Sequence, residues 1–362
     1  MSAIMNFLRR IRAERRTLGM RNLVLNSNRS VLQVDPSVPD FRKQGFSLSE
    51  SKEFSLGRVN DFRDYISTWE AYQPRFSDNT YFCISDDKYL FSLVFRRYID
   101  TPKTVSLIRD GKMVPLEQDL TDIDGLIRWI RENNGCVIKD RCGYNGFNVF
   151  VISLRDGRMS YKDRIMEKDD LVRMIGEIPN GIIQERAFQG AYASGLFEGS
   201  VNTVRIISIR PPGGIKHEIV GAVQRIGTHA SAPVDNFSQG GLSAPIDLES
   251  GILGKASGAD SFDRDGNRVF YARHPDSGAQ IEGVAIPNWG AIKDKIVDVT
   301  EQLPFFEYIA WDLVVRDHGV SVLETNMKSM LGIFQIHGGA RNAPLGEAYR
   351  KHGWLVDEKF FK

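Results

Sequence analysis

One segment, residues 308–326, constrains the fold of this chain more than any other. It contains two apolar runs separated by the polar sequence Arg-Asp-His-Gly, which predicts an antiparallel hairpin. We expect residues 317–319 to form a three-residue loop with Gly319 in the left-handed conformation. Arg316 then pairs with Val320, and this single pair sets the register of the whole hairpin.

The predicted register brings three oxygen-bearing side chains onto one face of the hairpin. Asp312 lies opposite Glu324, and Asn326 joins them because side chains two residues apart on a strand share a face. Two carboxylates and an amide carbonyl are hard oxygen ligands, which suit Mg²⁺ bound together with substrate phosphates. The alternative is a solvated sheet face, on which two facing acids repel each other.

A second candidate site begins at Lys139, at the end of the apolar strand Val-Ile-Lys. The loop that follows, residues 140–148, contains Gly143 and Gly146. A lysine ammonium and the free N–H groups of such a loop can surround phosphate oxygens. The GxxxxGK[ST] pattern of a P-loop and the GxGxxG turn are both absent. The alternative is a hairpin with a Gly-rich turn and a solvated lysine.

The hydrophobic pattern predicts a mixed α+β architecture with mostly antiparallel strands. Helices are expected from residue 86 until a break before Pro102, and over 123–132, 168–178 and 287–304. Strands are expected over 104–108, 136–139, 149–154, 181–185, 201–209, 218–226, 308–315 and 320–325. An Asp-Gly pair at 110–111 indicates a hairpin turn. Residues 227–260 are rich in Gly, Ser and Asn and are expected to form a long functional loop with one hairpin, 244–256.

Composition narrows the classes of function. The chain has 47 Lys plus Arg against 46 Asp plus Glu, and this balance argues against a nucleic-acid partner. Its apolar stretches are far shorter than the roughly 20 residues that a membrane-spanning helix needs. Three cysteines without a CxxC pair are too few for a disulfide framework and fit a reducing cytoplasm.

The first 19 residues carry five arginines against one acid, with apolar residues at near-helical spacing. This pattern predicts a short basic amphipathic helix and lacks the features of a secretory signal. The helix either packs on the rest of the protein or lies on an anionic membrane, which would make the protein peripheral at the inner membrane face. Residues 20–75 are predicted to be helical and partly irregular.

In their order and spacing, several short motifs resemble the ATP-grasp superfamily, most closely its sugar-transfer-associated branch. The resemblance covers about residues 86–339. The motifs are Ser85-Asp-Asp-Lys88, Asp100-Thr-Pro102, Lys139, the loop 143–146, Ile182-Ile-Gln-Glu-Arg186, Asn202-Thr-Val-Arg205, and the trio Asp312, Glu324 and Asn326. The resemblance implies an ATP-grasp fold, in which two α+β lobes grip ATP, preceded by a helical N-terminal extension.

The resemblance also implies roles for single residues. Nucleotide contacts fall to Lys88, Lys139, Gly143, Gly146, Gln184, Glu185 and Arg205. Gln184 and Glu185 would meet the adenine edge at the hinge between the lobes. Catalytic roles fall to Lys139, Arg205, Arg225, Asn236 and His274, and Mg²⁺ to Asp312, Glu324 and Asn326. The alternative for His274 is a loop histidine that caps the following turn.

The predicted domains are an N-terminal region (1–75), the two lobes of the grasp (76–183 and 184–340) and a C-terminal tail (341–362). The N-terminal region departs from the pattern of many ligases of the superfamily, because it lacks the βαβ alternation of a Rossmann-like domain. The identity of the substrates therefore does not carry over from those ligases.

The chemistry that the resemblance implies is ATP- and Mg²⁺-dependent ligation of a small-molecule carboxylate to an amine through an acylphosphate. A glycine-hinged loop would close over that intermediate and protect it from water. The name of the branch suggests exopolysaccharide or aminosugar-linked biosynthesis. Two alternatives stay open: an ATP-grasp kinase that phosphorylates a hydroxyl, and a nucleotide-binding regulator without turnover.

Overall fold

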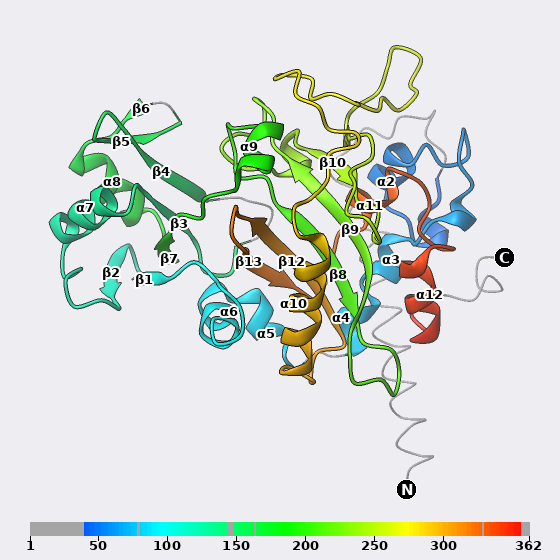
Figure 1. Ribbon diagram of the computed structural model, residues 1–362, viewed down its shortest axis with the longest axis horizontal. Coiled ribbons are helices and arrows are strands. Elements are labelled where there is room, and N and C mark those ends of the chain that lie inside the picture. Colours follow the sequence, from blue (N-terminus) through cyan, green and yellow to red (C-terminus); the bar gives the residue numbers. More distant parts are fainter. Residues whose placement is uncertain (1–39, 78–79, 144–147, 163, 328, 356–362) are drawn as a thin grey trace, which may run out of the picture.

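The computed structural model describes residues 40–77, 80–143, 148–162, 164–327 and 329–355, and it is built on two antiparallel sheets (Figure 1). The basic helix expected in residues 1–19, and Gly146, lie outside the described residues. Both sheets are joined by helices and long connections into the mixed α+β architecture that the hydrophobic pattern predicts.

The first sheet has seven strands in the order β2-β1-β7-β3-β4-β5-β6 and lies on the left of Figure 1. The strands are β1 (Thr104–Arg109), β2 (Lys112–Pro115), β3 (Cys136–Asp140), β4 (Val149–Arg155), β5 (Arg158–Tyr161), β6 (Arg164–Ile165) and β7 (Asn180–Glu185). Two amphipathic helices, α7 (Ile123–Glu132) and α8 (Lys168–Gly176), pack on one face. Ile138 and Ile183 point into this core, so Lys139 and Gln184, one residue further along β3 and β7, face the opposite side.

The second sheet has six strands in the order β11-β10-β9-β8-β12-β13. They are β8 (Val204–Ile209), β9 (Glu218–Ile226), β10 (Leu242–Pro245), β11 (Ser257–Gly258), β12 (Tyr308–Val315) and β13 (Val320–Asn326). One face packs against α5 (Phe82–Asp86), α6 (Lys88–Phe95), α9 (Ala191–Leu196) and α10 (Trp289–Glu301). The pairing of β10 with β11 confirms a hairpin within the long connection after β9.

The other face of the second sheet is covered by residues from both ends of the described chain and by Phe237 from the connection after β9. They belong to short helices, namely η1 (Arg42–Gln44), α2 (Leu48–Glu53), η2 (Phe62–Asp64), α3 (Thr68–Ala71), α4 (Gln73–Ser77), η3 (Phe237–Gln239), α11 (Gly332–Gln335) and α12 (Pro344–Lys351), and to the turns between them. Within residues 40–75 the structure consists of short helices and irregular segments.

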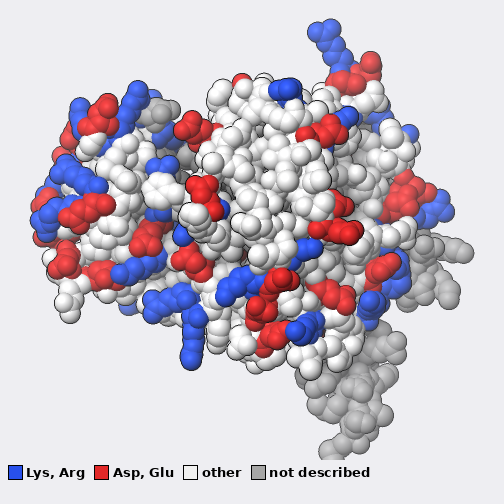
Figure 2. Space-filling model, in the orientation of Figure 1, with Lys and Arg blue, Asp and Glu red and all other residues white. Residues whose placement is uncertain are grey.

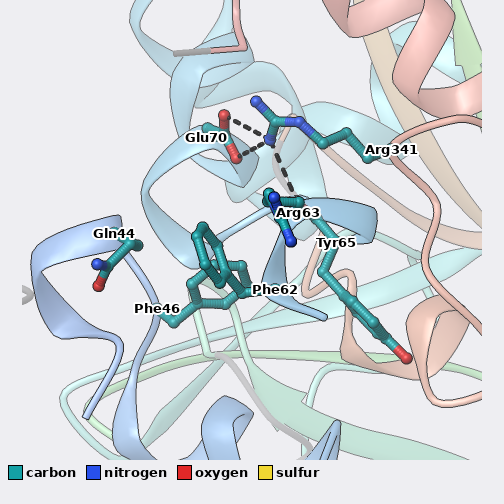
Figure 3. A pocket seen from close by; sticks show the side chains of 7 residues that line it. All are labelled: Gln44, Phe46, Phe62, Arg63, Tyr65, Glu70 and Arg341. Carbon is teal, nitrogen blue, oxygen red and sulfur yellow. Dashed lines mark hydrogen bonds and ion pairs between the residues drawn. The ribbon is translucent and has the colours of Figure 1, made fainter. Parts of the chain in front are cut away.

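Hydrogen bonds fasten the N-terminal region to the rest of the fold. The buried Gln335 amide accepts from the backbone N–H of Ile66 (2.7 Å) and donates to the Ile66 carbonyl (2.8 Å). Arg341 pairs with the buried Glu70 at 2.9 Å. A small pocket beside this pair is lined by Gln44, Phe46, Phe62, Arg63, Tyr65, Glu70 and Arg341 (Figure 3). None of these residues is a predicted site residue. The lining combines residues from 44–70 with Arg341, so the pocket lies where the N-terminal region meets the segment between α11 and α12.

On the face that Figure 2 shows, positive and negative side chains are mixed: Lys and Arg lie among Asp and Glu. This mixing agrees with the near-zero net charge of the sequence. Within the described ranges, no helix is long and apolar enough to cross a membrane.

Candidate ATP and magnesium site

The β12–β13 hairpin pairs Asp312 with Glu324, as the sequence predicts. The predicted route to this pair is wrong, however, because Val320 pairs with Val315 and not with Arg316. The loop therefore has four residues, 316–319, and is closed by a hydrogen bond from the N–H of Arg316 to the carbonyl of Gly319 (3.0 Å). Gly319 is left-handed, with φ of 79°, as expected.

A bulge in β13 restores the predicted pair. Val322 lies opposite Leu313, and the next pair is Glu324 with Asp312, so Leu323 is the extra residue. The bulge turns Val322 toward the helix-covered core while Glu324 remains on the face of Asp312. The hairpin thus buries its valines and still presents its carboxylates on the other side of the sheet.

Asp312 is the centre of a buried network of charges. Its side chain is 3% exposed, and both of its oxygens accept from Arg205, which lies directly opposite on β8. Arg225 of β9 donates to the Asp312 Oδ2 atom at 3.4 Å. Burial alone would raise the pKa of Asp312, but the two guanidinium groups outweigh it and hold the pKa below its usual value. The carboxylate is therefore ionised at neutral pH.

Asp235 extends this network and is a site residue that the sequence analysis missed. Its Oδ1 atom pairs with Nη2 of Arg225 at 2.8 Å. Its Oδ2 atom accepts from the backbone N–H (2.7 Å) and the hydroxyl (2.5 Å) of Thr203. The available signal was its place one residue before Asn236, in the loop 227–260 that we expected to be functional.

The first sheet and α6 bring two lysines close to Glu324 on β13. The Nζ atom of Lys88 donates to the carbonyl of Gly143 (2.6 Å) and lies 3.8 Å from Oε2 of Glu324. Lys139 is buried nearby, and burial together with the charge of Lys88 lowers the pKa of Lys139 to about 8, although Glu324 opposes the shift. Lys139 is therefore not the solvated strand lysine of the alternative interpretation.

The start of α6 fixes Lys88 in place. Asp87 caps the helix by accepting from the backbone N–H groups of Tyr89 (2.9 Å) and Leu90 (3.1 Å), and its carboxylate also binds Arg141 (2.5 Å). The same guanidinium pairing lowers the pKa of Asp87 against the opposing effect of burial. Since Arg141 begins the Gly-rich loop, the loop and the helix that carries Lys88 are joined at their bases.

These contacts bring residues from distant parts of the sequence together in one site. A comparison of the sequence with models of known families identifies the family. Residues 67–347 match the model of the sugar-transfer associated ATP-grasp family. The chain belongs to this family. The match confirms the suspected branch and the ATP-grasp fold expected from the motifs.

Solved ATP-grasp structures match the chain at low sequence identity. D-alanine–D-alanine ligase from Bacillus anthracis is 12% identical over 75% of this chain and 63% of that chain, with a TM-score of 0.37. The ATP-grasp ligase PsnB, complexed with a precursor peptide and AMPPNP, is 14% identical over 77% and 59%, with a TM-score of 0.37. The ADP complex of purK, N5-carboxyaminoimidazole ribonucleotide synthetase, is 10% identical over 74% and 51%, with a TM-score of 0.38.

The chain thus spans less than two thirds of the length of these solved proteins. No curated protein matches the sequence.

The donor set of this ATP-grasp protein fits a magnesium ion that also binds substrate phosphates. Asp312 and Glu324 supply two facing carboxylates, and Asn326 lies on the same strand face as Glu324. The Nδ2 atom of Asn326 is buried and has no hydrogen-bond partner among the described residues, so this N–H group can still donate to an acceptor such as a phosphate oxygen, while Mg²⁺ would bind the amide oxygen Oδ1. No group of three His, Cys, Asp or Glu side chains in the described residues is placed to hold a metal alone.

At the predicted hinge, the two expected adenine contacts differ in their surroundings. Gln184 donates to the hydroxyl of Thr104 (2.9 Å), while its buried Oε1 atom lacks a partner in the described structure. The backbone N–H and the side chain of Glu185 are both bound to Lys103, at 2.9 and 3.0 Å. Of Gln184 and Glu185, it is therefore Gln184 that has a buried polar atom, Oε1, available to a ligand.

Two predicted catalytic residues hold turns. Asn236 caps η3 by accepting from the N–H of Ser238 (3.0 Å). His274 is buried, stacks on Phe197, and binds the carbonyl of Gly227 (2.8 Å) through Nε2. Its Nδ1 atom accepts from the N–H groups of residues 276 and 277 at 3.1 and 3.2 Å. His274 thus has the turn-capping contacts of the alternative interpretation, and the structure does not bring it into the Asp312 network.

The first residue of the Asn202-Thr-Val-Arg205 motif also has a supporting position. The buried Asn202 amide donates to the carbonyls of Ala193 (2.8 Å) and Phe197 (2.6 Å) and accepts from the N–H of Gly227 (2.9 Å). It fastens α9 and the end of β9 to the start of β8, from which Arg205 projects.

Proposed function

We propose that this ATP-grasp protein is an ATP- and Mg²⁺-dependent ligase that joins a small-molecule carboxylate to an amine through an acylphosphate. One observation carries the proposal: Asp312, paired with Glu324 across the hairpin, contacts two arginines of the second sheet, Glu324 lies 3.8 Å from the lysine of α6, and a buried lysine of the first sheet lies close enough to feel the charge of Glu324. These cations are Lys88, Lys139, Arg205 and Arg225. Such an arrangement suits a metal-bound triphosphate better than any neutral ligand.

In this proposal Asp312, Glu324 and Asn326 hold Mg²⁺, which offsets charge on the phosphoryl group when bound. Lys88 and Lys139 orient the phosphates from the side of the first sheet, and Arg205 and Arg225 from the second. Gly143 and Gly146 belong to the loop that excludes water. Gln184 and Glu185 receive the adenine, while Asn236 and His274 position the acceptor side through the turns that they cap.

The reaction proceeds in two balanced steps. A carboxylate oxygen of the acid forms a bond to the γ-phosphorus as the bond to the bridging oxygen breaks, and ADP leaves with that electron pair. The amine nitrogen then attacks the carbonyl carbon, inorganic phosphate leaves, and the amine loses a proton to solvent. Cations held in place before the reaction stabilise the first step without reorganising.

The remaining parts of the assignment are also proposals. We place the substrates in exopolysaccharide or aminosugar-linked biosynthesis, on the basis of the family's association with sugar transfer. We place the protein in the cytoplasm, with the basic N-terminal segment as a peripheral contact at the inner membrane face and no nucleic-acid partner. The division into residues 1–75, 76–183, 184–340 and 341–362 remains our prediction, although α6 already packs on the second sheet.

A trapping experiment tests the ligase. The protein is incubated with ATP, Mg²⁺, hydroxylamine and a panel of carboxylic acids, and hydroxamate is measured together with ADP. We expect a hydroxamate for the right acid, because an acylphosphate is a strong acyl donor. Glu324→Gln serves as the inactive control, and Asp124→Asn, at a surface ion pair with Lys168 (2.7 Å), as the active one.

Other outcomes would redirect the assignment. ADP release with a stable phosphorylated product and no hydroxamate would indicate the kinase. Tight ATP binding without ADP release, across the acids and a matching panel of hydroxyl compounds, would indicate the regulator.

A further inference from the structure

The carboxylates of the site all have cation partners before any ligand arrives. Arg205 holds Asp312, Arg225 pairs with Asp235 at 2.8 Å, and Lys88 lies 3.8 Å from Glu324. A nucleotide therefore meets arginines whose charge is already balanced. Binding of its phosphates requires these cations to change partners.

Asp312 is the point where this exchange has to occur. Both of its oxygens are engaged by Arg205, yet Asp312 also lies directly opposite Glu324 in the candidate metal site. A divalent ion on Asp312 would repel a guanidinium group on the same carboxylate, because both are positive and the site is buried. The metal and Arg205 therefore compete for Asp312.

The two arginines differ in what holds them when Asp312 is withdrawn. Arg225 keeps Asp235, whose other oxygen is fixed by the N–H and hydroxyl of Thr203. Arg205 has no second carboxylate within ion-pair distance in the described structure, only the hydroxyl of Ser329 at 3.4 Å. Loss of Asp312 as a partner frees Arg205 and leaves Arg225 in place.

We propose that Asp312 is an exchange point, which holds Arg205 in the nucleotide-free protein and releases it toward the phosphates when Asp312 takes up Mg²⁺, while Asp235 is a positioning residue that retains Arg225. The proposal rests on the proposed function, which makes Asp312 a metal ligand. The exchange couples the binding of Mg²⁺ to the binding of ATP. Mg²⁺ on Asp312 frees Arg205 for the phosphates, and phosphates on Arg205 free Asp312 for Mg²⁺. Such coupling is reciprocal.

The first test measures ATP affinity by calorimetry, with excess EDTA and with Mg²⁺, in the wild type and in Asp312→Asn. Neutralising Asp312 frees Arg205 without a metal. We therefore expect the variant to bind metal-free ATP at least fivefold more tightly than the wild type and to lose most of the enhancement by Mg²⁺. Adding Arg205→Gln to the variant should abolish the gain, and Asp124→Asn, at the surface ion pair with Lys168, should match the wild type. Unchanged or weaker binding of metal-free ATP by folded Asp312→Asn would overturn the exchange.

The second test uses the wild-type chain, so it does not depend on the folding of Asp312→Asn. Phenylglyoxal labels accessible guanidinium groups, and mass spectrometry locates the adducts. Millimolar Mg²⁺ alone should raise labelling of Arg205 severalfold and leave Arg225 unchanged, whereas Mg²⁺ with ATP should protect both. In Asp235→Asn, Mg²⁺ should expose Arg225 as well. An equal extent of Arg205 labelling with and without Mg²⁺ would overturn the proposal.

The two proposals can fail separately, because neither readout involves turnover. The predicted affinities and labelling without any hydroxamate would reject the ligase and support the exchange. Hydroxamate formation together with unaltered metal-free affinity in Asp312→Asn would reject the exchange and support the ligase.

Discussion

The two sheets present their site residues in opposite ways. The first sheet has a helix-covered core on one face and carries Lys139 and Gln184 on the other, where an oxygen of Gln184 lacks a partner among the described residues. The second sheet is covered on both faces, and its Asp312 and Arg205 are bound to each other. The first sheet thus presents a polar atom of Gln184 that has no partner in the described structure. In the second sheet, by contrast, Asp312 and Arg205 must give up their contact before either can bind a ligand.

The largest effect expected from this comparison is at Glu324, on the second sheet. Glu324→Gln removes a metal-facing charge from a partly exposed side chain, so the fold should remain and Mg²⁺-dependent ATP turnover should fall by a factor on the order of 10² or more. ADP release is the measurement. Turnover at the wild-type rate would remove the hairpin from the metal site.

A pH effect on stability is expected next, from the core of the second sheet. Buried His217 binds Ser208 and the carbonyl of residue 306, each at 3.0 Å, and burial lowers the pKa of His217 to about 4. Because the folded pKa lies below the unfolded value, stability is present at neutral pH and is lost as the pH falls from about 6.5 toward 4. The stabilisation lost is about 3 kcal/mol.

Denaturant titrations at several pH values measure this loss. His217→Gln should unfold with a weaker pH dependence than the wild type over that window. His318→Gln, at an exposed residue of the loop between β12 and β13, is the control and should keep the wild-type profile. Parallel profiles for wild type and His217→Gln would contradict the prediction.

A smaller effect is expected from Lys139 on the first sheet. Lys139→Ala should weaken ATP binding about tenfold or more, since a charge-assisted contact to phosphate is lost. The apo protein should not lose thermal stability, because Lys139 lies buried near the like charge of Lys88. Calorimetry and thermal melting decide. Wild-type ATP affinity would show that this face does not meet the nucleotide.

The smallest effect is expected at the helical side of the first sheet. Lys168 pairs with Asp124 at 2.7 Å across α8 and α7, with both side chains about half exposed. Lys168→Ala should change the free energy of unfolding by less than about 1 kcal/mol and leave ATP affinity unaltered. A loss as large as that expected from acidification of His217 would show that this helical layer depends on its surface charges.

Much of the local structure could be predicted from the sequence. Ile123–Glu132 forms the helix that its apolar stripe and the following Asn-Asn-Gly indicate, and Glu218–Ile226 forms the strand expected there. The Asp110-Gly111 turn has positive φ angles of 51° and 71°, as a two-residue hairpin turn requires. These features depend on neighbours in sequence, so the local pattern contains the needed information.

The site was predictable to the extent that its residues lie in recognisable motifs. Asp235 was missed because its function depends on contacts with Arg225 and Thr203, which are distant in sequence. The burial of Lys139 was missed for a similar reason: the groups that surround it come from α6 and β13. The sequence also left open whether His274 caps a turn, and its contacts with Gly227 and Phe197 answer that question.

The β12–β13 hairpin separates the features that the sequence determines from those that depend on tertiary packing. The sequence by itself determined that two strands meet at a turn that contains Gly319, but the pairing of Asp312 with Glu324 depends on the bulge. In a regular strand, however, Val320 and Val322 would share the face of Glu324. Only the packing of the valines against the helix-covered core decides that Leu323 bulges, so that Val320 and Val322 turn toward this core while Glu324 and Asn326 share the face of Asp312. Local alternation cannot encode that choice, because it arises from the two different environments on the two faces of the second sheet.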